Sequence, residues 1–173
     1  MTSSVKAARD HDAKRRGDPA APGFVLDDSP FFLVNQVAAA YARVMESSLR
    51  AVGMDIPRWR VLMLAQQSGW LPMGEVAELA GMKLPTATKV VQRLARDGLL
   101  KTRVCRADRR VTEVGLSPAG RRAVTTIRSV ASGVYREAFG QFKAGEVESL
   151  NNLLRQVRAS LSAARSRRRS PHD

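Results

Sequence analysis

The chain has 173 residues, the length of one domain or of one domain with tails, and 44% of them are apolar, enough for a folded core. No apolar run approaches the roughly 20 residues that span a bilayer, and the N-terminus lacks the apolar stretch of a signal peptide, so we expect a cytoplasmic protein without a membrane partner. The formal net charge of +13 indicates a polyanionic partner.

The N-terminal part divides into a tail and a long helix. Residues 1–28 hold five Lys/Arg and five Asp among Pro and Gly without apolar periodicity, which predicts a flexible tail. Ser29-Pro30 is typical of a helix start. Apolar side chains then recur every three or four residues and predict a helix over about 30–50 with a broad apolar face: Phe31, Val34, Val37, Ala38, Tyr41, Val44, Met45 and Leu49.

Three shorter helices are predicted between residues 55 and 97. Asp55 caps the first, whose inward residues are Trp59, Leu62, Met63 and Ala65. Pro72 opens the second, in which Val76, Leu79 and Ala80 face inward, and Gly81 supplies the following turn. Pro85 lies in the first turn of the third, whose inward residues are Ala87, Val90, Val91 and Leu94, and Gly98 suits its end.

A hairpin and two more helices complete the chain. Residues 99–105 and 110–116 predict two strands joined by a polar turn. Ser117-Pro118 begins a helix that ends near Gly140 or Gly145. A last amphipathic helix carries Val147, Leu150, Leu153, Leu154, Val157 and Leu161, and residues 165–173 predict a basic, frayed end.

Positive charge is concentrated in the third short helix and the hairpin. Residues 83–110 contain nine Lys/Arg and two Asp, a balance of +7 in 28 residues. The order helix, turn, helix, hairpin is that of a winged helix-turn-helix, which places one helix in a major groove of DNA and the hairpin, or wing, beside it.

The third short helix has an outer face suited to DNA. Hydroxyl, amide and cationic side chains serve both phosphate contact and reading of base edges, and this face has no acid before Asp97. The candidate contacts are Thr86, Thr88, Lys89, Gln92 and Arg93. The alternative interpretation is a solvated helix with a chance excess of basic residues.

The tip of the wing is rich in arginine. Arg106, Arg109 and Arg110 surround Asp108, and an arginine here could enter a narrow minor groove, where the negative potential is strongest. Asp108 would then orient an arginine. An ordinary turn that favours Asp is the alternative, and the two interpretations are compatible.

Several segments resemble the MarR family of bacterial regulators. Asp108-Arg109-Arg110, followed by Val114, Leu116, Ser117 and Gly120, resembles the wing signature D-x-R-x-x-x-V-x-L-[ST]-x-x-G. The stretch 57–62 (PRWRVL) resembles the pattern of that family's second helix, 75–80 (EVAELA) its third helix, and 88–94 (TKVVQRL) its recognition helix. The resemblance extends from about residue 30 to residue 162.

This resemblance implies a mainly α fold with a small β-wing, arranged as an obligate homodimer. The expected organisation is a flexible tail at 1–28, a MarR-like domain at 29–164 and a basic end at 165–173. Within the domain, the winged lobe spans about 56–116 and the dimerisation helices span about 30–50 and 118–164. The apolar surface of these helices, more than one lobe can cover, independently favours a dimer, and a two-fold dimer suits a pseudo-palindromic operator.

The resemblance also implies a small effector, held between the dimerisation helices and the lobe. By position, Tyr41, Trp59, Arg60 and Met63 could line such a site, although Trp59 and Met63 could equally belong to the core. Some urate-binding relatives carry an acid where this chain has Arg60, so we expect an anionic aromatic compound or its CoA thioester instead.

The main hypothesis is therefore a ligand-responsive transcriptional repressor without cofactor or metal. A sequence-tolerant, chromosome-organising DNA-binding protein is the first alternative. An enzyme on a helical dimer scaffold is the second, but no catalytic constellation is present to name. Cys105, the only cysteine, is interpreted as a strand residue without a redox role, although Arg103 and Arg106 could lower the pKa of its thiol.

Overall fold

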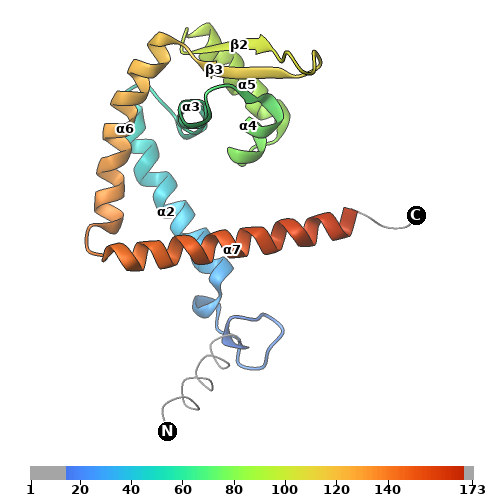
Figure 1. Cartoon of the computed structure of the whole chain (residues 1–173). Helices are drawn as coiled ribbons and strands as arrows, with labels where there is room; N and C mark the ends of the chain where they lie inside the picture. Colours follow the sequence, from blue (N-terminus) through green and yellow to red (C-terminus); the bar gives the residue numbers. More distant parts are fainter. Residues whose placement is uncertain (1–14, 170–173) are drawn as a thin grey trace. The chain divides into compact units, whose positions relative to one another are not determined.

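The computed structural model describes residues 15–169 and is mainly helical, with one small sheet (Figure 1). The chain divides into two compact units, Met1–Ala131 and Ser132–Asp173, and the boundary between them falls within helix α6. In chain order the elements are η1 (Leu26–Asp28), α2 (Pro30–Arg50), α3 (Ile56–Ser68), β1 (Leu71–Pro72), α4 (Met73–Leu79), α5 (Leu84–Arg96), β2 (Leu100–Val104), β3 (Thr112–Leu116), α6 (Pro118–Phe139) and α7 (Ala144–Arg169). None of the helices among the described residues is both long enough and apolar enough to cross a membrane.

The predicted helix boundaries follow local capping signals. Asp55 accepts a hydrogen bond from the backbone N–H of Arg58 at 2.8 Å, the contact by which a cap residue satisfies a free donor at a helix start. The Ser117 hydroxyl accepts one from the N–H of Gly120 at 2.9 Å at the start of α6. Gly98 ends the turn after α5 at a φ of 71°, a conformation that favours glycine.

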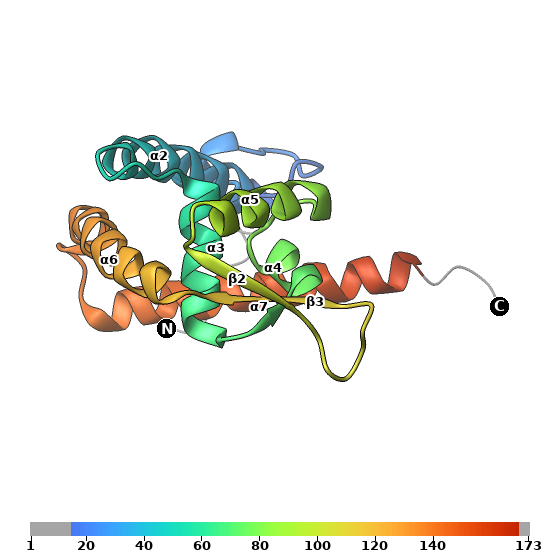
Figure 2. The same cartoon turned by 90° about the horizontal axis from the view of Figure 1, so that it is seen from above.

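The lobe from α3 to β3 has its own core. Helix α5 packs against α3 and α4, and the sheet, in the order β1-β3-β2, is antiparallel throughout. Figures 1 and 2 show the loop between β2 and β3 projecting from the lobe. The largest fully buried side chains of the lobe are Val61, Leu62, Val76, Val91, Leu94 and Val114, and Met45 and Leu49 at the end of α2 are also fully buried.

The structure corrects three local predictions. Leu79 was expected inward but is 54% exposed, and Ala77 is buried in its place. The second strand was expected from Arg110 and begins at Thr112, because the turn at Asp108 includes residues 110 and 111. Helix α7 continues to Arg169, where a frayed end was expected from residue 165. Residues 170–173 lie outside the described part.

The segment before α2 has more local structure than the sequence predicted. An ion pair joins Arg16 to Asp28 at 2.6 Å, and the N–H of Val25 donates to the carbonyl of Arg16 at 2.9 Å. Residues 15–28 are therefore a hydrogen-bonded loop that ends in η1. The other half of the expected flexible tail, residues 1–14, lies outside the described residues.

Candidate DNA-binding surface

Helix α5 has an apolar stripe on its inner face and polar side chains on its outer face. Ala87, Val91 and Leu94 are buried with at most 1% exposure, because they recur at helical spacing against α3 and α4. The outer positions Thr86, Lys89, Gln92, Arg93 and Arg96 are exposed. Thr88 departs from the prediction in part, since it is half-buried and its hydroxyl donates to the carbonyl of Leu84 at 2.9 Å. The hydroxyl oxygen can still accept a hydrogen bond.

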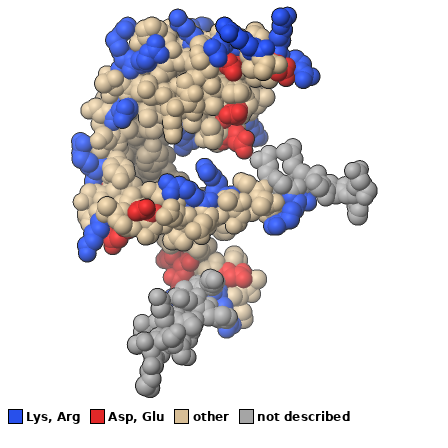
Figure 3. Space-filling model, viewed as in Figure 1, with Lys and Arg blue, Asp and Glu red and all other residues tan. Residues whose placement is uncertain are grey.

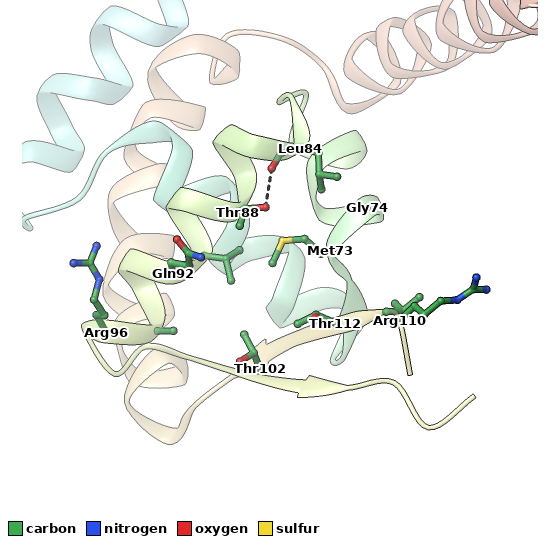
Figure 4. A pocket seen from close by; sticks show the side chains of 12 residues that line it. Met73, Gly74, Leu84, Thr88, Gln92, Arg96, Thr102, Arg110 and Thr112 are labelled. Carbon is green, nitrogen blue, oxygen red and sulfur yellow. Dashed lines mark hydrogen bonds between the residues drawn. The ribbon is translucent and has the colours of Figure 1, made fainter. Parts of the chain in front are cut away.

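A groove of about 790 Å³ separates α5 from the wing. Thr88, Gln92 and Arg96 line it from the helix, and Thr102, Arg110 and Thr112 line it from the wing (Figure 4). In Figure 4 the side chain of Arg110 points away from the helix, beyond one end of the groove. The helix and the wing thus form two walls of one surface. In Figure 3, Lys and Arg atoms gather at the top of the view, where Figure 1 shows α5 and the wing.

The tip of the wing is a turn organised by Asp108. Its carboxylate accepts hydrogen bonds from the backbone N–H of Arg110 at 3.0 Å, from Nε at 3.2 Å and from Nη2 at 3.3 Å. The side-chain bond from Arg110, followed by the backbone bond, lowers the pKa of Asp108 from its ordinary value of 3.8. The side chain of Arg110 nevertheless remains 91% exposed. Asp108 therefore orients an arginine that is available to a partner; Arg106 and Arg109 are exposed beside it.

The four residues expected to bind an effector lie on α2 and α3. Burial raises the pKa of Tyr41 from its ordinary value of 10.0, and the positive charge of Arg60 acts in the opposite direction. Arg60 donates to the carbonyl of Ala80 at 3.4 Å. The Nε1 of Trp59 is buried without a hydrogen-bond partner among residues 15–169, and Met63 is half-buried. The groove beside the wing includes none of the four.

Metal ligation has no candidate in the described part of the chain, where no three His, Cys, Asp or Glu side chains are grouped for a metal ion. Cys105 is half-buried at the end of β2, and its backbone N–H donates to the carbonyl of Val111 at 2.8 Å. This bond closes the wing loop.

Comparison with known proteins identifies the family. A model of the MarR family matches residues 52–111. The chain is 33% identical to the HTH-type transcriptional repressor IacR of Pseudomonas putida over 140 residues, which cover 81% of this chain and 84% of that protein. The chain belongs to the MarR family.

Solved structures of MarR-family regulators have the same fold. A MarR-family regulator from Silicibacter pomeroyi has a TM-score of 0.72 at 21% identity, over 79% of this chain and 92% of that one. A mutant of MarR from E. coli, complexed with operator DNA, has a TM-score of 0.64 at 20% identity, over 72% and 90% of the two chains. These structures show a winged helix-turn-helix fold, and the family and the 33% identical relative make the chain a DNA-binding transcriptional regulator.

Sequence reasoning missed two contact networks in this MarR-family chain. Arg103 was counted with the basic wing surface, but it pairs with Glu113 at 2.7 Å and lies over the Trp70 ring at 4.1 Å. Arg58 donates to the carbonyl of Gly53 at 2.6 Å and to Asp55 at 3.0 Å. The pairing of Arg103 with Glu113 depends on the strand register and that of Arg103 with Trp70 on the fold, so no short sequence pattern indicates either.

Proposed function

We propose that this regulator is a ligand-responsive repressor that binds a pseudo-palindromic operator as a homodimer. The observation that carries the proposal is the shared surface of α5 and the wing, where exposed Lys89, Gln92 and Arg93 lie on the same lobe as the exposed Arg110 guanidinium. A recognition helix in the major groove would bring the wing over the adjacent minor groove. The curated relative, IacR, is a repressor, which supports the same direction of regulation.

Each part of the surface has a proposed role. Thr86, Thr88, Lys89, Gln92 and Arg93 would contact the major groove, with Gln92 and Arg93 able to bond base edges through two groups at once. Arg106, Arg109 and Arg110 would contact phosphates or the minor groove, and Asp108 would hold Arg110 in place.

A homodimer is supported by the apolar surface of α2 and α7. Phe31, Val37 and Tyr41 of α2 are 58%, 66% and 39% exposed in the single chain, and Leu153 and Leu161 of α7 are 60% and 54% exposed. Such faces are normally covered in a stable protein. Dimerisation is typical of the family, and a two-fold dimer would present two α5 helices to half-sites about one helical turn, roughly 10 base pairs, apart.

The effector we propose is an anionic aromatic compound or its CoA thioester, bound near Tyr41, Trp59, Arg60 and Met63. Trp59 offers a buried N–H that has no partner among the described residues, and Arg60 offers a positive charge close enough to affect the pKa of Tyr41. Two fold neighbours support this class of compound. CouR from Rhodococcus jostii RHA1 is bound to p-coumaroyl-CoA, and the DNA binding of BpsR from Bordetella bronchiseptica is regulated by 6-hydroxynicotinic acid.

Selection from a random pool of duplex DNA tests the DNA-binding part. We expect the full-length protein to enrich a palindromic consensus that it binds at least about 10³-fold more tightly than random DNA at physiological salt. Affinities within about threefold of each other would instead establish the sequence-tolerant alternative. The selected consensus is also the operator for the binding measurements.

A thermal-shift screen of aromatic acids and their CoA thioesters, followed by operator release, tests the effector part. A compound bound at about 100 times its Kd adds roughly 2.7 kcal/mol to the free energy of unfolding. The matched variant Trp59→Phe keeps an aromatic ring and removes the N–H, so it should reduce the shift. A compound that stabilises the protein but leaves the operator bound would contradict the inducer mechanism.

A further inference from the structure

The turn that ends the recognition helix α5 is held by two other connections between elements. One is the connection between α2 and α3, and the other is the connection between the wing and α6. After Arg96, the chain turns through Asp97 and Gly98, and the N–H of Leu99 donates to the carbonyl of Leu94 at 2.9 Å. This turn leaves the Asp97 carboxylate and the carbonyls of Gly98 and Leu99 as acceptors. Arg58, in the first turn of α3, forms an ion pair with the Asp97 carboxylate, and Ser117, just before α6, donates hydrogen bonds to the two carbonyls.

The first junction lies between α2 and α3 and acts through Arg58. Its guanidinium donates to the carbonyl of Gly53 and to the carboxylate of Asp55, and it lies 3.6 Å from the carboxylate of Asp97. The Arg58 side chain is only 13% exposed. Its five N–H donors are held in a rigid plane, so one guanidinium can join three groups at fixed angles. Arg58 therefore connects the turn that follows α2 to the end of α5.

The second junction lies between the wing and α6 and acts through Ser117. The Ser117 hydroxyl donates to the carbonyl of Gly98 at 2.6 Å and accepts from the N–H of Gly120 at 2.9 Å. The backbone N–H of Ser117 donates to the carbonyl of Leu99 at 3.1 Å. Ser117 is 5% exposed, so water does not compete for these bonds.

The first turn of α6 approaches the end of α5 so closely that residue 120 must be glycine. A Cβ on Gly120 would lie 2.0 Å from the carbonyl oxygen of Leu99, well inside van der Waals contact. The contact is between two backbones, which cannot move apart without breaking the bonds of Ser117. The start of α6 and the end of α5 thus behave as one rigid joint.

We propose that Arg58 and Ser117 are positioning residues, through which α2 and α6 fix the orientation of the recognition helix. Neither needs to contact DNA. Both hold the same turn, Arg58 through the turn that follows α2 and Ser117 from the start of α6. Helix α2 carries one of the apolar faces that we propose to form the dimer, and α6 leads along the chain to α7, which carries the other. The inference rests on that proposed dimer. The contacts of Arg58 and Ser117 would fix each α5 helix relative to the dimerisation helices, and so set the distance between the two α5 helices of the dimer.

Half-site spacing provides a readout that a loss of stability alone would not change. The wild-type protein is first used to select its consensus from random duplex DNA, and binding is then measured to that consensus and to duplexes with one base pair added or removed between the half-sites. If selection with the wild type enriches no sequence, the proposed function fails. If a consensus is found, the variants test the joints alone.

Ser117→Ala is the main variant, and Ser117→Thr, which retains the hydroxyl, is the conservative rescue. We expect Ser117→Ala to bind the consensus about fivefold more weakly, the worth of one hydrogen bond, and to lose at least half of the wild-type preference for the native spacing. Ser117→Thr should restore both. Thr125→Ala is the matched control, because its hydroxyl bonds a carbonyl within the same helix at 3.3 Å.

Asp97→Asn tests the Arg58 joint without removing a buried group. The Asp97 side chain is 44% exposed, so we expect a smaller change in spacing preference than for Ser117→Ala, in the same direction. Glu46→Gln, which alters the exposed pair with Arg50, is its control. A wild-type spacing preference in a folded Ser117→Ala protein overturns the proposal. If Ser117→Ala has no cooperative unfolding transition, Asp97→Asn decides: a preference equal to that of Glu46→Gln overturns the proposal, and a reduced one supports it.

Discussion

The winged lobe and the helices α2 and α7 differ in where their apolar side chains lie. In the lobe, Leu62, Val91 and Leu94 are at most 1% exposed, so α3, α4, α5 and the sheet cover one another. In α2, Phe31 and Val37 are 58% and 66% exposed, and in α7, Leu153 is 60% exposed. One chain therefore completes the core of the lobe that we propose to bind DNA, and it leaves exposed the helix faces that we propose to join a second copy. The comparison separates a lobe with a complete core from helices that expose large apolar side chains in the single chain.

The largest expected effect comes from a charge on the uncovered helices. Val37→Asp should dissociate the dimer, because an unpaired carboxylate would be buried at the interface. Loss of simultaneous contact with two half-sites should weaken operator binding about 10²- to 10⁴-fold. Sedimentation velocity and an operator titration measure the two effects. Gln36→Asp, at the exposed neighbouring position, is the control; an unchanged dimer in Val37→Asp would remove this face from the interface.

A cavity in the lobe should act on folding instead of association. Leu94→Ala removes a side chain with 0% exposure, at an expected cost of about 2–5 kcal/mol in the free energy of unfolding. Leu79→Ala, at a site that is 54% exposed, should stay within about 0.5 kcal/mol of the wild type. Chemical denaturation measures both. Equal losses in the two variants would mean that the lobe is not packed as the structure has it.

The next effect concerns which bases the lobe reads. Gln92 is exposed on α5 and lines the groove, so Gln92→Ala should leave folding unchanged. It should lower the discrimination at one operator position by about 1–3 kcal/mol. Binding to operators substituted one base pair at a time measures this. A uniform loss over all positions would show that Gln92 contacts only the DNA backbone.

A smaller effect is expected at the wing. Arg110→Ala removes a side chain that is 91% exposed, so the unfolding transition at neutral pH should move only slightly. Operator affinity should fall, and the slope of log affinity against log salt should decrease by about one, the value for one phosphate contact. Arg50→Ala, exposed at the end of α2, is the control. Unchanged affinity in both Arg110→Ala and Arg109→Ala would exclude the wing from binding.

The smallest effect is a change in the titration of Asp108. Arg110 holds the pKa of Asp108 below its ordinary value of 3.8, so Arg110→Ala should raise that pKa toward 3.8. Because the pKa of Asp108 is lowered in the folded protein, the Arg110–Asp108 pair adds to the free energy of unfolding at pH values above the ordinary pKa. This contribution is lost as the pH falls through the pKa of Asp108 in the folded protein. A carboxyl NMR titration measures the change. Arg109→Ala should leave it unmoved; equal shifts in both variants would assign the effect to net charge.

The elements that the sequence predicted well depend on signals within a few residues. Asp55, Gly98 and Ser117 act on N–H and carbonyl groups of their own turns, so their roles follow from the residue type and its neighbours. The apolar stripe of α5 is equally local, because thirteen residues define its phase well. The seven residues of α4 do not, and Leu79 was accordingly assigned to the wrong face.

The contacts that the sequence could not predict join residues far apart in the chain. Arg103 forms an ion pair with Glu113 on the neighbouring strand, and Arg58 forms one with Asp97, 39 positions further along the chain. Both ion pairs can be recognised only when the fold is known. A Cβ on Gly115 would lie 2.9 Å from the ring of Trp70. The Trp70 ring that stacks under Arg103 therefore packs directly against the sheet. The roles of the DNA-contacting and effector residues remain predictions.

The two faces of α5 have a consequence for how such regulators diverge. Val91 and Leu94 are constrained by the core, whereas Lys89, Gln92 and Arg93 are exposed and bury little. Mutations at the exposed positions cost little stability, so they can accumulate while the chain still folds. A duplicated gene could therefore acquire a different operator through a few substitutions on one helix face. Paralogous regulators could in this way come to control different genes while retaining the same scaffold.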